Sequence, residues 1–339
     1  MKKVNFNYLV IATLIVAAVF TSCKKNNNDD ENNDNGNNNN DTTIVSIYDT
    51  AHFDVYVAGT IYNTSTSSSV AVLWKNGVMQ NLSDKTNSAM AHSVYVSGND
   101  VYVVGYEGTS AVLWKNGIVQ KLTNGTYFAC ALSVYISGND VYVVGYGNKY
   151  SDFSIAIFWK NGVEQNLVDG SQYSISESVF VLGNDVYIAG YEGNIPKAKL
   201  WKNGIAQILG DSISMARSVY VSGNDVYVAG MEQNIAKFWK NGVAQNLVNG
   251  LANSVFVIGN DVYIAGDKNN IATVWKNGVI QNLSDGTNHA TTATSVYVVE
   301  NDVYVVGNGH TGAIVWKNGV AQSLAGGTFA NSVFVVKKP

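Results

Sequence analysis

The stretch from Ser218 to Gly230, Ser-Val-Tyr-Val-Ser-Gly-Asn-Asp-Val-Tyr-Val-Ala-Gly, decides the fold. It holds two runs of β-branched and aromatic residues on either side of Gly223-Asn224, a dipeptide that accepts the positive φ of a tight hairpin turn. Apolar residues point to both faces of these runs, which is typical of strands covered on both sides. The stretch therefore predicts an antiparallel hairpin inside a layered β-structure.

The same pattern recurs along the chain from about residue 44 onward, in copies of 36 to 45 residues. All seven tryptophans stand in the tetrapeptide Trp-Lys-Asn-Gly, at Trp74, Trp114, Trp159, Trp201, Trp239, Trp275 and Trp316. Periods near 40 residues are typical of propellers and solenoids. The internal repeat is thus the main clue to the architecture.

Each copy contains four short strands, which we name A to D in chain order. In the second copy they are expected over 93–96, 101–104, 111–114 and 118–122, with Gly98-Asn99 and Asn116-Gly117 in the turns. Four antiparallel strands in each of seven copies predict an all-β, seven-bladed β-propeller. A β-solenoid is the alternative, and the tight turns disfavour it because they force an antiparallel meander.

The two ends of the repeat region complement each other. The chain ends on a strand A, 331–335, with no B, C or D after it, whereas the first copy has only a degenerate strand A, 44–48. We expect the C-terminal strand to complete blade 1 and close the ring, with 44–48 beside the seam. Closure removes an exposed sheet edge that would otherwise favour aggregation.

The pattern at 218–230 resembles bacterial β-propeller repeats of the SBBP and NHL type. The resemblance covers about residues 44–336, and it implies the fold. It does not imply an activity, because propellers host binding proteins, scaffolds and enzymes alike.

The N-terminus has the features of an export signal. Lys2 and Lys3 precede an apolar run over 8–20, and Phe20-Thr21-Ser22-Cys23 resembles the lipobox of bacterial lipoproteins. The resemblance implies a lipoprotein signal peptide over 1–22 and lipidation of Cys23, which would become the mature N-terminus. The alternative is an ordinary secretory signal with a chance cysteine.

Residues 23–43 are rich in Asn and Asp, and after Cys23 they include no apolar side chain. We expect a disordered tether here and a propeller domain over 44–339. The acidic run 29–31 resembles the export signal of some surface-exposed lipoproteins, which implies an outer-membrane lipoprotein at the cell surface rather than in the periplasm. With Cys23 acylated, Cys130 has no partner for a disulfide.

Composition and motifs exclude several function classes. A net charge of -4 with evenly spread lysines argues against nucleic acid as a partner. There is no Ser-His-Asp order, HExxH motif or phosphate loop, so we predict no catalytic residue, metal or cofactor. We also expect a monomer. His289, His310 and Asp285 are the one conceivable metal set, against the simpler interpretation of exposed loop histidines.

The most regular positions have structural interpretations. In four copies the strand-B Asp lies fifteen residues before the Lys that follows Trp, as in Asp225 and Lys240, which predicts cross-strand ion pairs rather than ligand-binding groups. Each Trp is expected between blades rather than exposed as a sugar-stacking platform. Small residues lead into strand A, at Ala91, Ala131, Ser176, Ala216, Ala252, Ala293 and Ala330.

Variable positions gather at the B–C and D–A loops, which share one end of every blade. The residue just before strand A differs between most copies and is expected to surround the channel mouth, at His92, Leu132, Glu177, Arg217, Asn253, Thr294 and Asn331. Aromatic residues also cluster on blades 2 to 4, at Tyr106, Tyr127, Phe128, Tyr146, Tyr150, Phe153, Tyr173 and Tyr191.

These loops led to the functional prediction. We expect a membrane-anchored, surface-exposed lipoprotein that binds a glycan or protein through its loop face, with the aromatic residues, His92, Glu177 and Arg217 as candidate ligand contacts. The alternatives are a hydrolase or lyase with its active site at the channel mouth, and a ligand-free scaffold subunit of an envelope complex.

Overall fold

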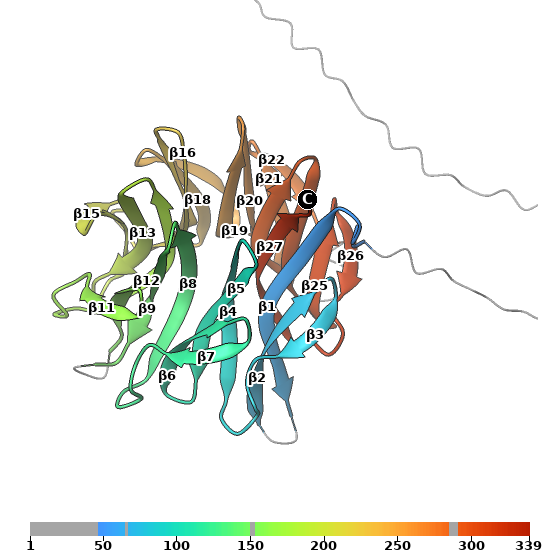
Figure 1. The fold of residues 1–339 in the computed structure, drawn as a ribbon. Coiled ribbons are helices and arrows are strands. Elements are labelled where there is room, and N and C mark those ends of the chain that lie inside the picture. Colours follow the sequence, from blue (N-terminus) through green and yellow to red (C-terminus); the bar gives the residue numbers. More distant parts are fainter. Residues whose placement is uncertain (1–46, 65–66, 150–152, 285–290) are drawn as a thin grey trace, which may run out of the picture. The chain divides into compact units, whose positions relative to one another are not determined.

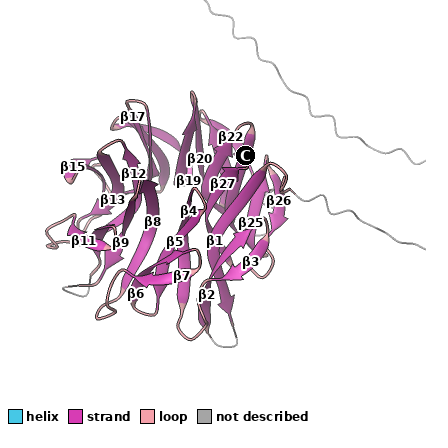
Figure 2. Ribbon diagram, viewed as in Figure 1, coloured by secondary structure: helices cyan, strands magenta, loops and turns pink. Residues whose placement is uncertain are grey.

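The computed structural model describes residues 47–64, 67–149, 153–284 and 291–339. Every regular element in these residues is a β-strand (Figures 1 and 2), as the repeat predicts. The described part of the chain includes no helix of the length and apolar character that a membrane span requires. The predicted signal peptide, Cys23 and the predicted tether lie outside the described residues.

The strands form antiparallel sheets that follow the sequence repeats, so we number the repeats 1 to 7. Repeat 1 contains β27 (Phe329–Lys337), β1 (Phe53–Asn63), β2 (Ser68–Lys75) and β3 (Val78–Asn81). Repeat 2 contains β4 (Ala89–Ser97), β5 (Asp100–Glu107), β6 (Ser110–Lys115) and β7 (Ile118–Lys121). Repeat 3 contains β8 (Ala129–Ser137), β9 (Asp140–Gly147), β10 (Ile155–Lys160) and β11 (Val163–Asn166).

The remaining repeats continue this order. Repeat 4 contains β12 (Ser174–Leu182), β13 (Asp185–Glu192), β14 (Lys197–Lys202) and β15 (Ile205–Ile208). Repeat 5 contains β16 (Ser214–Ser222), β17 (Asp225–Glu232), β18 (Ile235–Lys240) and the start of β19 (Val243–Ile258). Repeat 6 contains the end of β19, β20 (Asp261–Lys268), β21 (Ile271–Lys276) and β22 (Val279–Asn282). Repeat 7 contains β23 (Thr292–Val299), β24 (Asp302–Gly309), β25 (Gly312–Lys317) and β26 (Val320–Ser323).

Strand β19 differs from the expected pattern, because it runs without a break from repeat 5 into repeat 6 and joins their sheets into one of seven strands. The connection between strands D and A is shorter here than in the other repeats. Asn249 pairs with Ile235 of β18, and the next residue, Gly250, pairs with Lys268 of β20. No residues are left over for a loop, so the two sheets share a strand.

The C-terminal strand β27 pairs antiparallel with β1, as its lack of local partners predicts. Tyr48, from the degenerate first strand, is buried in one cluster with Val55 of repeat 1 and Tyr304 of repeat 7. The described end of that segment therefore lies beside the seam. The sheets form a propeller-like all-β body around a common centre (Figure 1).

The tryptophans form the core between neighbouring sheets, since all seven are at most 2% exposed. Trp114 of repeat 2, for example, packs in a cluster with Leu73 of repeat 1. The indole Nε1 of Trp239 donates to the backbone oxygen of Leu209 at 2.9 Å. The prediction that Trp packs between repeats is confirmed.

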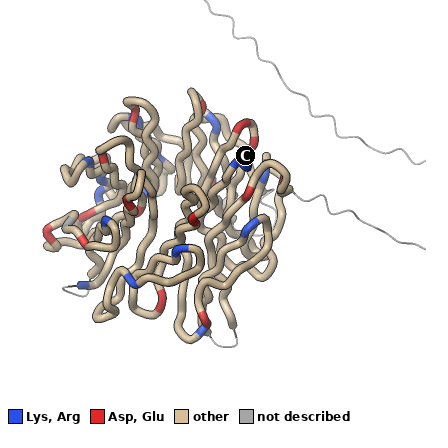
Figure 3. Tube along the Cα trace, in the orientation of Figure 1, with Lys and Arg blue, Asp and Glu red and all other residues tan. Residues whose placement is uncertain are grey.

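The turns are built by one repeated unit of four side chains. In repeat 5, Lys240 Nζ lies 2.7 Å from Asp225 Oδ2 and 5.2 Å from the centre of the Tyr227 ring. Asn241, at φ 52°, donates to Asp225 and accepts from the Val226 amide at 2.8 Å. The predicted Asp–Lys pair is present in every repeat. Figure 3 shows Lys and Arg positions interspersed with Asp and Glu positions along the described trace.

Candidate functional site at the channel mouth

Every repeat carries a β-bulge at the same point of its first strand. In repeat 2, Ala91 pairs with Gly105 and Ser93 pairs with Val104, so His92 has no partner in the ladder. A bulge bends the strand and redirects the extra side chain. The residues skipped in this way are His92, Leu132, Glu177, Arg217, Asn253, Thr294 and Asn331.

A glycine in the second strand makes room for each bulge. A Cβ on Gly105 would lie 1.8 Å from the backbone oxygen of Met90, and the equivalent distances elsewhere reach only 2.1 Å. These glycines are Gly59, Gly105, Gly145, Gly190, Gly230, Gly266 and Gly307. A glycine inside a strand often marks a bulge, and this regular signal could have located the site residues from sequence.

The bulged residues surround one cavity of about 340 Å³, together with Leu251 and Thr292. Their predicted position around a common opening is confirmed. Three residues further along the same strands stand Tyr95, Tyr135, Phe180, Tyr220, Phe256, Tyr297 and Phe334. Neighbouring rings of this set have centroids 4.8 to 5.0 Å apart, and Phe334 contacts Tyr95 at 4.8 Å. These aromatic side chains, which we call the aromatic belt, therefore contact one another through all seven repeats.

The mouth divides into two halves. Asn253 donates to the oxygen of Ala293 at 2.9 Å, Thr294 to that of Ala330 at 2.7 Å, and Asn331 to that of Ala91 at 2.8 Å. These three residues, which we call the closed half, use their polar groups to join neighbouring repeats. In the open half, defined as His92, Leu132, Glu177 and Arg217, no side chain forms a hydrogen bond or ion pair with another described residue.

Electrostatics distinguish the open half. Burial raises the pKa of the Glu177 carboxyl, and the positive charge of Arg217 opposes that rise. Burial lowers the pKa of His92 to about 4, so its imidazole is neutral at pH 7. Asp267, which is 5% exposed, also has a pKa raised by burial and opposed in part by Arg217. Arg217 thus acts on two carboxyl groups, while its own buried Nε has no partner among the described residues.

Several predicted aromatic residues continue the open half. The rings of His92 and Tyr106 have centroids 6.3 Å apart, Tyr106 and Phe128 5.5 Å, and Phe128 and Tyr146 6.2 Å. Burial, helped by Cys130 and Glu177, raises the pKa of Tyr146 to about 12. The structure therefore brings the aromatic side chains of repeats 2 and 3 next to the charged residues of the mouth.

The other aromatic candidates have different settings. The rings of Tyr173 and Tyr191 are tilted against each other with centroids 6.0 Å apart, and the pKa of Tyr191 is raised by burial and then by Glu177. The hydroxyl of Tyr127 donates to Glu164 at 3.2 Å, at a neighbouring cavity. Phe153 is half-buried, and Tyr150 lies outside the described residues.

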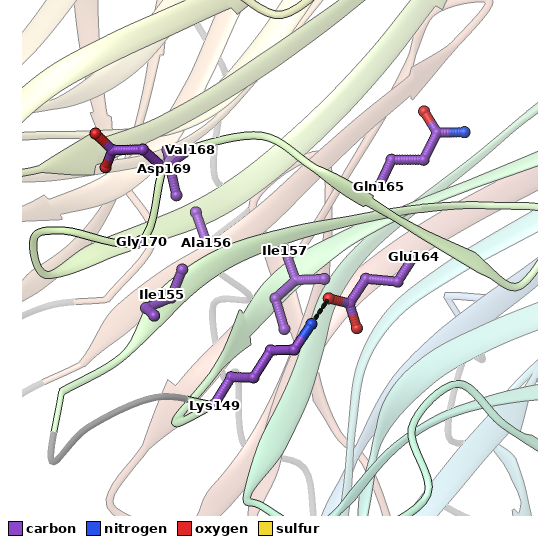
Figure 4. Close-up of a pocket in the computed structure, with 9 residues that line it drawn as sticks. All are labelled: Lys149, Ile155, Ala156, Ile157, Glu164, Gln165, Val168, Asp169 and Gly170. Atoms are coloured by element: carbon purple, nitrogen blue, oxygen red, sulfur yellow. Dashed lines mark hydrogen bonds and ion pairs between the residues drawn. The ribbon is translucent and has the colours of Figure 1, made fainter.

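That neighbouring cavity, of about 200 Å³, lies in repeat 3 (Figure 4). Lys149 points toward Glu164, and their Nζ and Oε1 atoms are 2.7 Å apart. The corresponding position of the other repeats carries Met79, Val119, Ala206, Ala244, Ile280 and Ala321. Glu164 therefore joins the long connection between β9 and β10 to strand β11, which is a structural role.

Most of the conceivable metal set lies outside the described residues. Asp285 and His289 lie outside the described residues, and His310 is exposed. Within residues 47–339, apart from the undescribed gaps, no cluster of three or more His, Cys, Asp or Glu side chains is placed to hold a metal ion.

Comparisons with known proteins give likeness in structure only. No family model matches the chain, and no curated protein matches it. A puromycin-hydrolysing peptidase of Mycobacterium tuberculosis aligns with a TM-score of 0.55 and 13% identity, over 80% of this chain and 51% of the peptidase. A prolyl endopeptidase aligns with a TM-score of 0.48 and 12% identity, over 80% and 47% of the two chains. The chain spans about half the length of these proteins.

The first of these structures shows the fold class, an all-β propeller-like body. That structure is one of a peptidase, and this finding stands against the binding function that the sequence led us to expect. The prediction of a surface protein that binds a glycan or protein through its loop face is therefore wrong. Loop variability cannot distinguish a binding surface from a substrate opening, which explains the error.

Proposed function

We propose that the chain is a closed seven-bladed β-propeller that takes part in peptide hydrolysis, with its channel mouth as the substrate site. Three observations support closure. β27 pairs with β1. The aromatic belt runs through all seven repeats and returns from Phe334 to Tyr95. A serine of each repeat accepts a hydrogen bond from the backbone amide of a valine in the next at 3.1 to 3.3 Å, and Ser332 accepts from Val94.

The observation that carries the substrate site is the unpaired pair of Glu177 and Arg217 in the open half. A buried donor without a partner, such as the Arg217 Nε, is costly, and groups with perturbed pKa values, such as Glu177, concentrate at functional sites. An amide substrate offers a carbonyl oxygen to the Arg217 guanidinium and an N–H to the Glu177 carboxylate. The aromatic side chains beside them suit the apolar side chains of a peptide.

The catalytic groups need not be those of the mouth. His92, Glu177 and Arg217 form no hydrogen bond with one another in the described structure, so a nucleophile and base are not assembled there. The chain also aligns with only 51% of the Mycobacterium tuberculosis peptidase. We therefore assign the propeller the role of holding peptide for hydrolysis by groups other than those of the mouth.

A second candidate is hydrolysis at the mouth itself, which the raised pKa of Glu177 favours. Water would add to the amide carbonyl carbon and give a proton to the Glu177 carboxylate. The C–N bond would break, and Glu177 would return the proton to the leaving amine. Arg217 would stabilise the negative charge on the carbonyl oxygen.

Puromycin and peptide p-nitroanilides test both versions with the purified full chain. We expect calorimetric binding that weakens about ten-fold or more in Glu177→Gln and Arg217→Met, because each removes a charge-assisted hydrogen bond. Glu300→Gln, in the turn between β23 and β24, is the matched control and should bind as the wild type does. Release of p-nitroaniline by the chain alone, lost in Glu177→Gln, would favour catalysis at the mouth. Absence of binding to every probe would overturn both versions.

We also propose that Cys23 carries the lipid anchor and that the chain is an outer-membrane lipoprotein. The support is the signal-like segment before Cys23 and the polar tether after it. Mass spectrometry of the full chain from a Gram-negative host should find an acylated N-terminal cysteine that is lost in Cys23→Ser. An unmodified N-terminus beginning elsewhere would overturn the anchor.

A further inference from the structure

The turn end of the propeller-like body carries a regular set of exposed aliphatic side chains. The first residue after each Trp-Lys-Asn-Gly turn is a valine or isoleucine that is 61% to 77% exposed. This set, which we call the aliphatic ring, consists of Val78, Ile118, Val163, Ile205, Val243, Val279 and Val320. A single exposed aliphatic residue needs no explanation, but all seven repeats leave this side chain outside the core, so the turn end carries a regular set of exposed apolar groups.

The N-terminal segment joins the body at this same end. Tyr48 is buried against the turn that precedes Val78, because a Cβ on Gly77 would lie 2.8 Å from the Tyr48 ring. Lys338 donates to the backbone oxygen of Thr50 at 2.6 Å, which fixes the following residues at the start of β1. The polypeptide that leads back to Cys23 therefore leaves from the turn end, opposite the bulged mouth.

We propose that the turn end rests on a phospholipid bilayer, with the aliphatic ring in the boundary between headgroups and acyl chains. This inference rests on the proposed lipidation of Cys23, which would hold the turn end at high local concentration near the membrane. A bilayer engages separate side chains without a complementary groove. Equivalent residues of a closed ring lie at one level, so a flat surface can meet all of them together.

The charges around the aliphatic ring are compatible with this placement. Each neighbouring lysine is paired with an aspartate, as Lys202 Nζ is with Asp185 Oδ2 at 2.7 Å, so the turn end carries balanced charge. Lysine stems can lie along apolar surface while their ammonium groups stay hydrated at the interface. A second membrane contact also strengthens anchoring by an acyl chain, because lipidated proteins bind membranes more stably when another part of the protein also contacts the bilayer.

This orientation directs the channel mouth away from the bilayer. The connection between β13 and β14, with Ile195 64% exposed, lies at the mouth end of repeat 4, whereas Ile205 lies at its turn end and is 77% exposed. Repeat 4 thus offers two exposed isoleucines, ten positions apart in sequence, that report opposite ends of the body.

A polarity-sensitive dye on Ile205→Cys or Ile195→Cys tests the placement in the full chain reconstituted into phosphatidylcholine–phosphatidylglycerol vesicles. Cys130 is 2% exposed and will label poorly. We expect a blue shift and quenching by brominated lipid for the dye at 205 and neither for the dye at 195. Equal signals, or a shift at 195 alone, would overturn the proposal. A blue shift of the dye at 205 that appears without vesicles and depends on protein concentration would assign the surface to a second copy of the chain. That result would also overturn the proposal.

Vesicle flotation of the full chain carrying Cys23→Ser separates the surface from the anchor. Ile118→Ser with Ile205→Ser and Val243→Ser should lower vesicle partitioning about ten-fold or more, because three exposed aliphatic side chains are lost. Ile195→Ser is the matched control and should not change it. If the triple variant floats as its parent does, the surface proposal is wrong, whatever the acylation of Cys23. Peptide binding at the mouth is measured separately, and its failure would leave these results unchanged.

Discussion

The two ends of each repeat use their side chains in opposite ways. At the turn end the same Asp, Asn, Lys and Tyr recur, and within each repeat the Asn and Lys contact the Asp while the Lys lies over the Tyr ring, as in repeat 5. At the mouth end one bulged position varies from repeat to repeat. The side chains of the open half form no hydrogen bond with another described residue. Repetition therefore stabilises the frame, and variation is confined to a position that the frame does not need.

The closed half of the mouth sharpens this contrast. Asn253, Thr294 and Asn331 each donate to a carbonyl of the next repeat, and they occupy neighbouring repeats 6, 7 and 1. The bulge can thus serve either as a joint between repeats or as a support for chemistry. Which one it serves depends only on the side chain that stands there.

The largest effect should come from the frame. Trp239→Ala is expected to lower the free energy of unfolding by about 3–5 kcal/mol, because it leaves a large cavity between repeats. Trp239→Phe should cost more than Trp275→Phe, since Trp239 donates to Leu209 whereas the Trp275 Nε1 has no described partner. Denaturant unfolding measures both. A mouth variant such as Leu132→Ala that cost as much as Trp239→Ala would contradict the division into frame and mouth.

The next effect tests the support beneath the mouth. Gly230→Ala should cost about 1–3 kcal/mol, because its Cβ would lie 2.0 Å from the Met215 oxygen and force the bulge to shift. Gly223→Ala is the control: no heavy atom lies within 4 Å of its Cβ site, and only its φ of 58° opposes alanine. That strain costs about 1–2 kcal/mol. Peptide binding should fall in Gly230→Ala and persist in Gly223→Ala. Equal binding in both variants would show that the bulge does not position the site.

Much of this architecture follows from local signals in the sequence. Gly223-Asn224 and Trp239 predict the hairpin and the packed core, because turn chemistry and burial leave strong local patterns. The Asp–Lys spacing predicts the ion pairs, as in Asp225 and Lys240. The seven positions around the mouth were also predicted, since equivalent residues of a repeat must lie at equivalent places.

Other features depend on contacts between distant segments, and the sequence does not reveal them. The bulge that exposes Arg217 depends on which residue of β17 pairs with Ala216, and that register is a property of two strands. Asn253 differs from Glu177 because its side chain donates to the Ala293 carbonyl of the next repeat. That carbonyl lies far away in the sequence. The function predicted from loop variability was wrong because variability identifies a position without identifying its ligand.

A smaller effect should come from the serine bonds between repeats. Ser218→Ala removes the acceptor of the Val255 amide at 3.1 Å and should cost about 1 kcal/mol. Ser222→Ala, further along the same strand, is the control and should stay within about 0.5 kcal/mol of the wild type. Thermal unfolding of both variants provides the measurement. If Ser222→Ala destabilised the chain more than Ser218→Ala, these bonds would not be what joins the repeats.

The smallest effect is a difference in sign between the two ends as pH changes. Lys240 and then Asn241 lower the pKa of Asp225, so this carboxylate adds stability above its unfolded pKa near 4 and loses it as pH falls through the folded value. Burial raises the pKa of Glu177, so the folded chain holds that proton more tightly, and stability falls as pH rises from the unfolded value through the folded one. Relative to the wild type, Asp225→Asn should therefore lose stability at neutral pH and recover in acid, whereas Glu177→Gln should gain stability at neutral pH. Denaturation midpoints between about pH 3 and pH 8 would reveal both trends. If both variants lost stability at neutral pH, Glu177 would be satisfied within the fold rather than available for a ligand.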